Sequence, residues 1–205
     1  MQVPGSPFWS IQVNPWQELF DVALWFRAAE RIEVAQGGEV PGPAEVEPRP
    51  ARSTGPSDGA ELAVGWLVWW HSLVAMPALS PPFGRADRAP QLAFSPPDFP
   101  GLARWPALHR VVAARWPEAN AWHLARKEAW IRAGPHRDLR TTAAVAELER
   151  ELGRKVRPFS VELLLLPVGD DEVRPIGSGR YLVPERLYAG PRWPGLLRAL
   201  LIPYA

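Results

Sequence analysis

The sequence predicts an α+β protein: a mostly helical single domain with a small antiparallel C-terminal sheet. Helical spacing of apolar residues recurs from residue 14 to residue 152, whereas extended, β-type sequence is concentrated between residues 156 and 183. The chain has 205 residues, of which 47% are hydrophobic, so it is long enough to bury a core without disulfides. We therefore expect one domain over residues 1–205.

The first helix is expected to follow a short extended segment at residues 8–13. Asn14 supplies an N-cap and Pro15 a proline at the first helical position, a combination typical of a helix start. Apolar residues then follow at mostly helical spacing. The glycine pair after Gln36 is expected to end this helix.

A flexible loop rich in proline and glycine is predicted at about residues 37–59. This stretch contains five prolines, five glycines, charges of both signs and no aromatic residue. Such a composition buries too little surface to offset the entropy lost on ordering the chain. We interpret it as a flexible excursion between two helices of one domain.

The second helix is predicted over residues 60–76 and is expected to form the centre of the core. Residues 62–79 are almost purely apolar and approach the length of a membrane span. However, His71 and Ser72 lie in the middle of this run, and Pro77 interrupts it. Its tryptophans are also central, whereas membrane proteins place tryptophan at the two interfaces. A membrane span is therefore not favoured.

The C-terminal half is expected to alternate further helices with the small sheet. A proline-rich but partly apolar stretch at residues 80–100 should pack in an ordered way across the surface. The helices predicted after it are residues 106–115, 117–133, one from Asp138 or Thr141 to Gly153, 184–188 and 194–202. The strands predicted as an antiparallel meander are residues 156–168, 173–176 and 180–183.

The composition excludes several classes of function. The formal net charge is +1, from 23 basic and 22 acidic residues, which disfavours nucleic acid and anionic membranes as partners. The absence of cysteine excludes disulfides, thiolate metal sites and a cysteine nucleophile. The four histidines lack the spacing of metal ligands on one helix, and Gly177-Ser178-Gly179 lacks the lysine of a phosphate-binding loop. We expect no metal and no cofactor.

The eleven tryptophans are the strongest positive signal in the chain. Trp66, Trp69 and Trp70 share one helix face, and Trp122 and Trp130 are placed to pack against them from a later helix. Most of these rings are expected in the core. The remaining tryptophan rings are available to line a groove for an apolar ligand or to anchor a partner. Tryptophan and arginine dominate the hot spots of protein interfaces.

His71 is the most interesting single candidate because it lies inside an apolar helix. A buried imidazole must find a hydrogen-bond partner, and such a group can act as a general base or orient a ligand. A hydrogen-bonded core histidine is the more common outcome, and we favour it here. The candidate ligand- or partner-binding residues are thus His71, Trp66, Trp69, Trp70, Trp122 and Trp130.

Two functional hypotheses follow from these observations. The favoured one is a non-catalytic cytoplasmic protein that binds a macromolecule, expected to be a protein, through a surface rich in tryptophan and arginine. An accessory, adaptor or immunity-type role would suit it, and the N-terminal sequence shows no signal peptide. The alternative is a small enzyme or small-molecule binder with an apolar aromatic pocket near His71. The sequence contains no catalytic motif, and it specifies neither the partner nor the oligomeric state.

Overall fold

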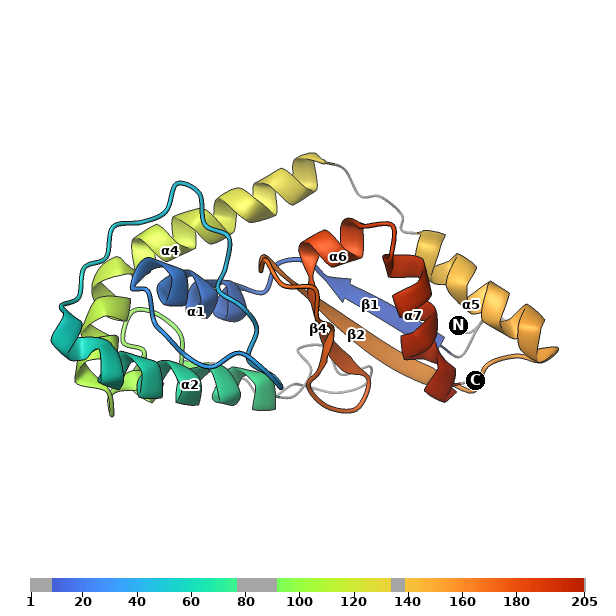
Figure 1. Ribbon diagram of the computed structural model, residues 1–205, viewed down its shortest axis with the longest axis horizontal. Helices are drawn as coiled ribbons and strands as arrows, with labels where there is room; N and C mark the ends of the chain where they lie inside the picture. The colour runs from blue at the N-terminus through green and yellow to red at the C-terminus, as the bar shows by residue number, and fades with distance from the viewer. Residues whose placement is uncertain (1–8, 77–91, 134–138, 205) are drawn as a thin grey trace.

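The fold is α+β and mostly helical, as predicted. The computed structural model describes residues 9–76, 92–133 and 139–204. Figure 1 shows two parts side by side along the long axis. The helical lobe contains α1, α2 and α4, and the sheet lobe contains the four strands with α5, α6 and α7.

The sheet is four-stranded and has the order β1-β2-β4-β3. Its strands are β1 (Trp9–Asn14), β2 (Phe159–Leu166), β3 (Arg174–Pro175) and β4 (Arg180–Pro184). The pairs β1–β2 and β2–β4 are parallel, and only β3–β4 is antiparallel. The predicted antiparallel character is thus only partial. The physical reason is that β1 pairs in parallel with β2 across the intervening helices, which supply the long crossover that parallel strands require.

The three parallel strands end at the same edge of the sheet, the edge that faces the helical lobe (Figure 1). Asn14 of β1 lies opposite Leu164, and Leu166 at the end of β2 lies opposite Pro184 of β4. Residues 161–168 are buried throughout, as expected for a strand covered on both faces. The chain enters the helical lobe from the end of β1, and α6 begins directly after β4.

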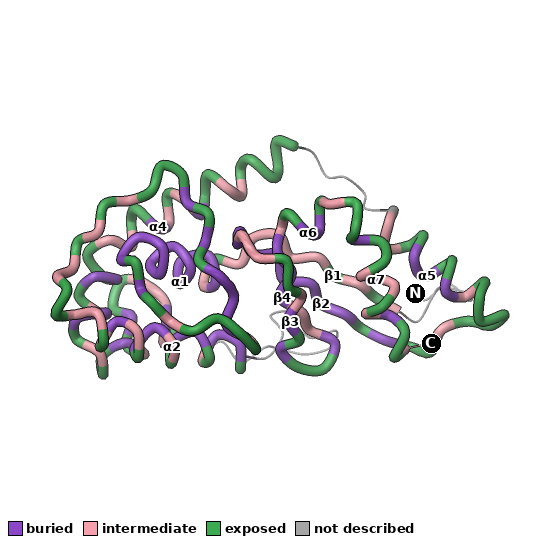
Figure 2. The backbone as a smooth tube through the Cα atoms, viewed as in Figure 1, coloured by how far each residue is buried: buried purple, intermediate pink, exposed green. Residues whose placement is uncertain are grey.

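Helix α1 (Glu18–Ala29) is the centre of the helical lobe. Every residue from Phe20 to Glu30 is buried, so this helix has no exposed face along that stretch (Figure 2). The predicted second helix also contributes to this core, with Trp66, Trp69 and Trp70 fully buried, but it is less completely enclosed than α1. The first helix is also shorter than predicted, because it begins after Gln17 and because Arg31 adopts a left-handed conformation with φ of 54°.

Helix α2 (Gly59–Ala75) confirms the second predicted helix to within one residue at each end. The indole N–H of Trp66 donates to the carbonyl of Ala23 at 2.7 Å, and that of Trp70 donates to the carbonyl of Glu39 at 2.7 Å. The two rings stack with their centroids 5.3 Å apart. Aromatic packing and satisfied indole donors thus join α2 to α1 and to the segment that follows α1.

Helix α4 (Pro106–Arg132) is continuous, although two helices were predicted in its place. Pro117 lies inside it and removes one backbone hydrogen bond, the one that the carbonyl of Ala113 would accept. Both residues are exposed, so water can satisfy that carbonyl. The helix therefore continues past the proline and extends toward the sheet lobe (Figure 1).

The segment between α1 and α2 packs more closely than its composition indicates. Val40, Ala44 and Val46 are buried in the apolar cluster of the helical lobe. The amide of Glu45 donates to the carbonyl of Pro167 at 2.8 Å, which ties the segment to the sheet lobe. The expectation that it buries little surface is wrong for these residues, whereas its flexibility stays a prediction.

The remaining helices complete the sheet lobe. They are α5 (Leu139–Leu152), α6 (Glu185–Ala189) and α7 (Trp193–Leu201), together with 3-10 turns at Pro56–Asp58, Pro100–Leu102 and Ile202–Tyr204. A second apolar cluster joins α5, α6 and α7 to the sheet. Most of the proline-rich stretch predicted to pack lies outside the described residues, although Phe94 and Phe99 are buried. Among the helices described, none is long and apolar enough to cross a membrane.

Candidate functional site: a pocket between the two lobes

A pocket of about 620 Å³ lies where the helical lobe meets the sheet lobe. Its lining comes from β1, the β1–α1 connection, the end of α4, the start of α5, and α6. The residues that line it are Ile11, Val13, Asn14, Pro15, Trp16, Gln17, Trp130, Ala133, Arg140, Thr141, Glu185, Tyr188 and Ala189. This volume lies within the range of small-molecule sites in proteins.

The topology of the sheet determines where this pocket lies. Because β1 and β4 are parallel to β2 and end at the same edge, residues 14–17 and residues 185–189 both lie at that edge. The carboxyl ends of parallel strands are the common location of ligand sites in open α/β sheets. The far end of α4 closes the pocket from the helical lobe.

Three aromatic residues, Trp16, Trp130 and Tyr188, line the pocket. The rings of Trp16 and Trp130 meet edge to face, with centroids 6.3 Å apart. The Tyr188 ring packs against Trp193 at 5.1 Å, and the Arg140 guanidinium lies 4.8 Å from the centroid of Tyr188. Such rings offer apolar area together with electron-rich faces that attract cations.

Glu185 brings a carboxylate to this aromatic pocket. Its side chain is 33% exposed, and its Oε1 accepts a hydrogen bond from Arg126. Its Oε2 accepts no hydrogen bond from the part of the chain that the structure describes. Burial raises the pKa of Glu185, and the guanidinium of Arg126 opposes that increase.

A buried ionic chain extends from Glu185 into the helical lobe. Arg126 also contacts the carboxylate of Asp21, which is fully buried on α1. The same carboxylate shares a hydrogen bond with Nδ1 of His123 at 2.7 Å. His123, Arg126 and Trp130 follow one another at i, i+3 and i+7, so α4 presents them on one face.

This arrangement fixes the position of the Glu185 side chain and leaves its Oε2 atom as a hydrogen-bond acceptor without a donor among the described residues. Arg126 is held by Asp21 on one side and stacks over the Trp122 ring at 5.1 Å on the other. A guanidinium constrained in this way orients the carboxylate that it contacts. Within the described ranges, no cluster of three histidine, aspartate or glutamate side chains could hold a metal ion.

The structure places some of the candidate binding residues in the core and others at the surface or at the pocket. Trp66, Trp69 and Trp70 are fully buried in the core, as expected for most of the tryptophans. Trp122 is half-buried beneath Arg126, and Trp130 lines the pocket. Trp130 is thus the predicted binding residue that the structure places at the pocket.

His71 is not a core residue, contrary to the favoured interpretation. Its side chain is 54% exposed, and its Nδ1 lies 3.5 Å from Oε2 of Glu39. The reason is its position on the outer side of α2, where Val64 and Val68 are exposed too. At the helical spacing of these three residues, all of them lie on one face, opposite the tryptophans.

Sequence reasoning missed the ionic chain at the site, which consists of Asp21, Arg126 and Glu185. A partial signal existed for two of them. Asp21 interrupts an apolar run in the first helix, and Arg126 shares helical spacing with His123. Glu185 had no local signal beyond following a predicted strand, because its surroundings come from distant segments.

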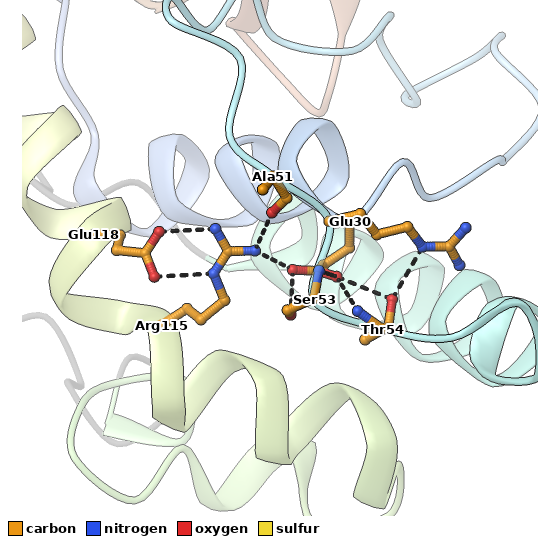
Figure 3. Close-up of polar contacts among 7 residues, drawn as sticks. Glu30, Ala51, Ser53, Thr54, Arg115 and Glu118 are labelled. Atoms are coloured by element: carbon orange, nitrogen blue, oxygen red, sulfur yellow. Dashed lines mark hydrogen bonds and ion pairs between the residues drawn. The ribbon is translucent and has the colours of Figure 1, made fainter.

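A second buried ionic cluster, drawn in Figure 3, lies around Glu30 at the carboxyl end of α1, and none of its labelled residues lines the pocket. The carboxylate of Glu30 accepts hydrogen bonds from the backbone N–H and hydroxyl groups of Ser53 and Thr54, at 2.8–3.0 Å, and from Arg115. Arg115 also forms a two-point contact with Glu118. Burial opposes ionisation of Glu30, but these hydrogen bonds outweigh it and lower its pKa.

The cluster around Glu30 has the features of a structural clamp. Both carboxylate oxygens accept several hydrogen bonds, so neither is left for a ligand. It joins α1, α4 and the segment before α2, which are distant in sequence (Figure 3). The pocket between the lobes, where an acceptor oxygen is open, is therefore the better functional candidate.

No protein-family model matches this chain, and comparisons with curated proteins and with solved structures found no significant match. Function is therefore inferred from the geometry of the pocket.

Proposed function

We propose that this protein binds a small organic ligand in the pocket between its lobes. The observation that carries the proposal is an open carboxylate oxygen, Oε2 of Glu185, in a pocket walled by Trp16, Trp130 and Tyr188. Ligand sites are typically apolar and aromatic, with a few polar groups that fix the orientation of the ligand. The pocket has this composition.

The small-molecule hypothesis from the sequence is kept, but the binding pocket is assigned to a different place in the structure. The sequence placed the aromatic pocket near His71, beside the tryptophans of α2. Those tryptophans fill the core, and His71 lies on the outer surface. The pocket between the lobes instead uses Trp130, together with aromatic residues that the sequence did not single out.

Binding of a protein partner remains a second candidate, favoured by the outer half of α4. Leu124 and Ile131 are 45% and 56% exposed there, and Trp130 is 36% exposed. Large apolar side chains gathered on one exposed helix end are typical of an interaction surface. In this alternative the protein would act as a non-catalytic adaptor in the cytoplasm, and exchanging Leu124 and Ile131 for glutamate would abolish stoichiometric capture of the partner.

A fragment screen by ligand-observed NMR tests the small-molecule proposal. Ala189 lines the pocket, so Ala189→Trp should fill part of it and abolish binding of the fragments that the wild-type protein binds. Ala199 of α7 is also exposed but does not line this pocket, so Ala199→Trp is the matched control. We expect fragment binding to survive in the control. Binding that is unchanged in Ala189→Trp, or an absence of any fragment binding at millimolar concentration, would refute the proposal.

A further inference from the structure

We propose that the ligand is an organic amine with an aromatic or aliphatic body, held through its ammonium group by Oε2 of Glu185. This inference rests on the proposed function, because it names the chemical class of ligand for the same pocket. Two observations carry it, the charge balance behind Glu185 and the aromatic wall beside it.

The ionic chain behind the pocket has more carboxylates than fixed cations. Asp21 and Glu185 share one guanidinium, that of Arg126. His123 contributes a positive charge only when its imidazole is protonated. The carboxylate of Glu45 adds a further negative potential at Glu185. The other guanidinium that lines the pocket, that of Arg140, lies over the Tyr188 ring and donates to the Tyr188 carbonyl. An ammonium group at Oε2 would supply a second cation to the pair Asp21 and Glu185, in surroundings where burial strengthens the attraction.

The acceptor geometry agrees with this charge balance. Arg126 occupies only Oε1 of Glu185, the side chain remains 33% exposed, and Glu185 lines the pocket. A hydrogen bond between an ammonium donor and a carboxylate is stronger than one between neutral groups. The ligand would not need to displace Arg126 to make it.

The aromatic wall provides the second recognition element. The edge-to-face pair of Trp16 and Trp130 lines the same pocket as Glu185. Aromatic faces attract ammonium groups and accommodate apolar bodies equally well. Within the lining, the guanidinium of Arg140 lies 4.8 Å from the centroid of the Tyr188 ring, an example of the same cation–aromatic contact.

The amine interaction should weaken on acidification. It requires an ionised Glu185, and burial raises the pKa of that carboxyl. The charged groups around Glu185 are Arg126 on α4, Asp21 on α1 and Glu45 before α2, with Arg140 of α5 lining the same pocket. We therefore expect affinity for an amine to fall as the pH drops through the raised pKa of Glu185, while affinity for an uncharged ligand stays constant.

Three probes that share an indole ring test this inference by isothermal titration calorimetry: tryptamine, the uncharged 3-ethylindole, and indole-3-propionate. Wild-type protein should bind tryptamine at least about tenfold more tightly than 3-ethylindole, the ratio that a charged hydrogen bond provides. Glu185→Gln should remove this preference and leave affinity for 3-ethylindole unchanged. Glu172→Gln, at an exposed glutamate outside the pocket, should keep it.

The following outcomes of this titration would overturn the inference. Equal affinities for tryptamine and 3-ethylindole, or a preference that survives Glu185→Gln, would exclude an ammonium at Glu185 but leave the pocket as a ligand site. Tighter binding of indole-3-propionate that is lost in Arg140→Gln would assign the pocket to carboxylates. Binding of none of the three would overturn the inference, and the Ala189→Trp fragment experiment would then decide the proposed function separately. If Glu185→Gln fails to fold, Glu185→Asp, which keeps the charge but shortens its reach, should weaken tryptamine selectively.

Discussion

Replacing Glu30 with glutamine is expected to lower the free energy of unfolding by about 3 kcal/mol. Glu30 is fully buried, and its two oxygens accept hydrogen bonds from Ser53, Thr54 and Arg115 (Figure 3). Glutamine has the same size, but its side-chain NH₂ group would replace one carboxylate oxygen. That NH₂ group cannot accept the hydrogen bonds that this oxygen now accepts, so their donors would lose a partner. Breaking a buried ion pair costs about 3–5 kcal/mol. Because Arg115 keeps its contact with Glu118, the lower end of this range applies.

Urea unfolding at several pH values provides the assay. The hydrogen bonds lower the pKa of Glu30 in the folded protein. Its contribution to stability is therefore fully present above pH 4.5, its ordinary pKa, and is lost as the pH falls through the lower folded value. The stabilities of the wild type and of Glu30→Gln should converge on acidification. Near neutral pH, the loss corresponds to a melting temperature lower by about 6–12 °C.

Glu118→Gln is the matched control, because Glu118 contacts the same arginine but is 54% exposed. Exposed ion pairs contribute little, so we expect a loss of less than about 1 kcal/mol. Equal losses in Glu30→Gln and Glu118→Gln would refute the assignment of the stability to the buried hydrogen bonds. A large loss in Glu30→Gln that did not depend on pH would point to packing instead of charge.

Two further predictions concern the helical lobe. Trp70→Ala should cost about 3–5 kcal/mol of unfolding free energy because its ring is fully buried. His71→Ala, one residue further along α2 on the exposed side, should stay within about 0.5 kcal/mol in the same urea assay; similar losses in both variants would contradict this placement. Replacing residues 39–57 with a short Gly/Ser linker should lower the melting temperature by about 10 °C or more, because Val40 and Val46 are buried. A change of a few degrees by calorimetry would instead support the flexible loop expected from composition.

Elements with a strong local pattern could be predicted from the sequence. The helix at residues 59–75 and the strand at residues 159–166 are mostly apolar and are bounded by glycine or proline, and the structure places both close to their predicted limits. The parallel pairing of β1 with β2 could not be predicted in the same way. It joins segments at opposite ends of the chain, and no residue in either strand specifies a distant neighbour.

Burial of charge explains why most of the candidate site could not be predicted. Acidic and basic residues in a helix normally indicate its solvated face. Asp21 of the candidate site is nevertheless buried in α1, as are Arg27 and, directly after the helix, Glu30, because α2, α4 and the segment before α2 surround this helix. Each of these charges has its partner on another segment, so the sequence of α1 alone gives no sign of the pairing.

The continuity of α4 decides where the pocket lies. The proline at position 117 predicted a break between helices at residues 106–115 and 117–133. Such a break would leave the direction of the second helix, which carries His123, Arg126 and Trp130 on one face, independent of the first. Because the proline is on the exposed side, the helix continues and brings this face to the edge where β1 and β4 end. Arg126 then meets Glu185, whose position was fixed by the sheet. The tryptophan content of the chain indicated aromatic surfaces, but the length of α4 determines that Trp130 is the tryptophan of this helix that lines the same pocket as Glu185.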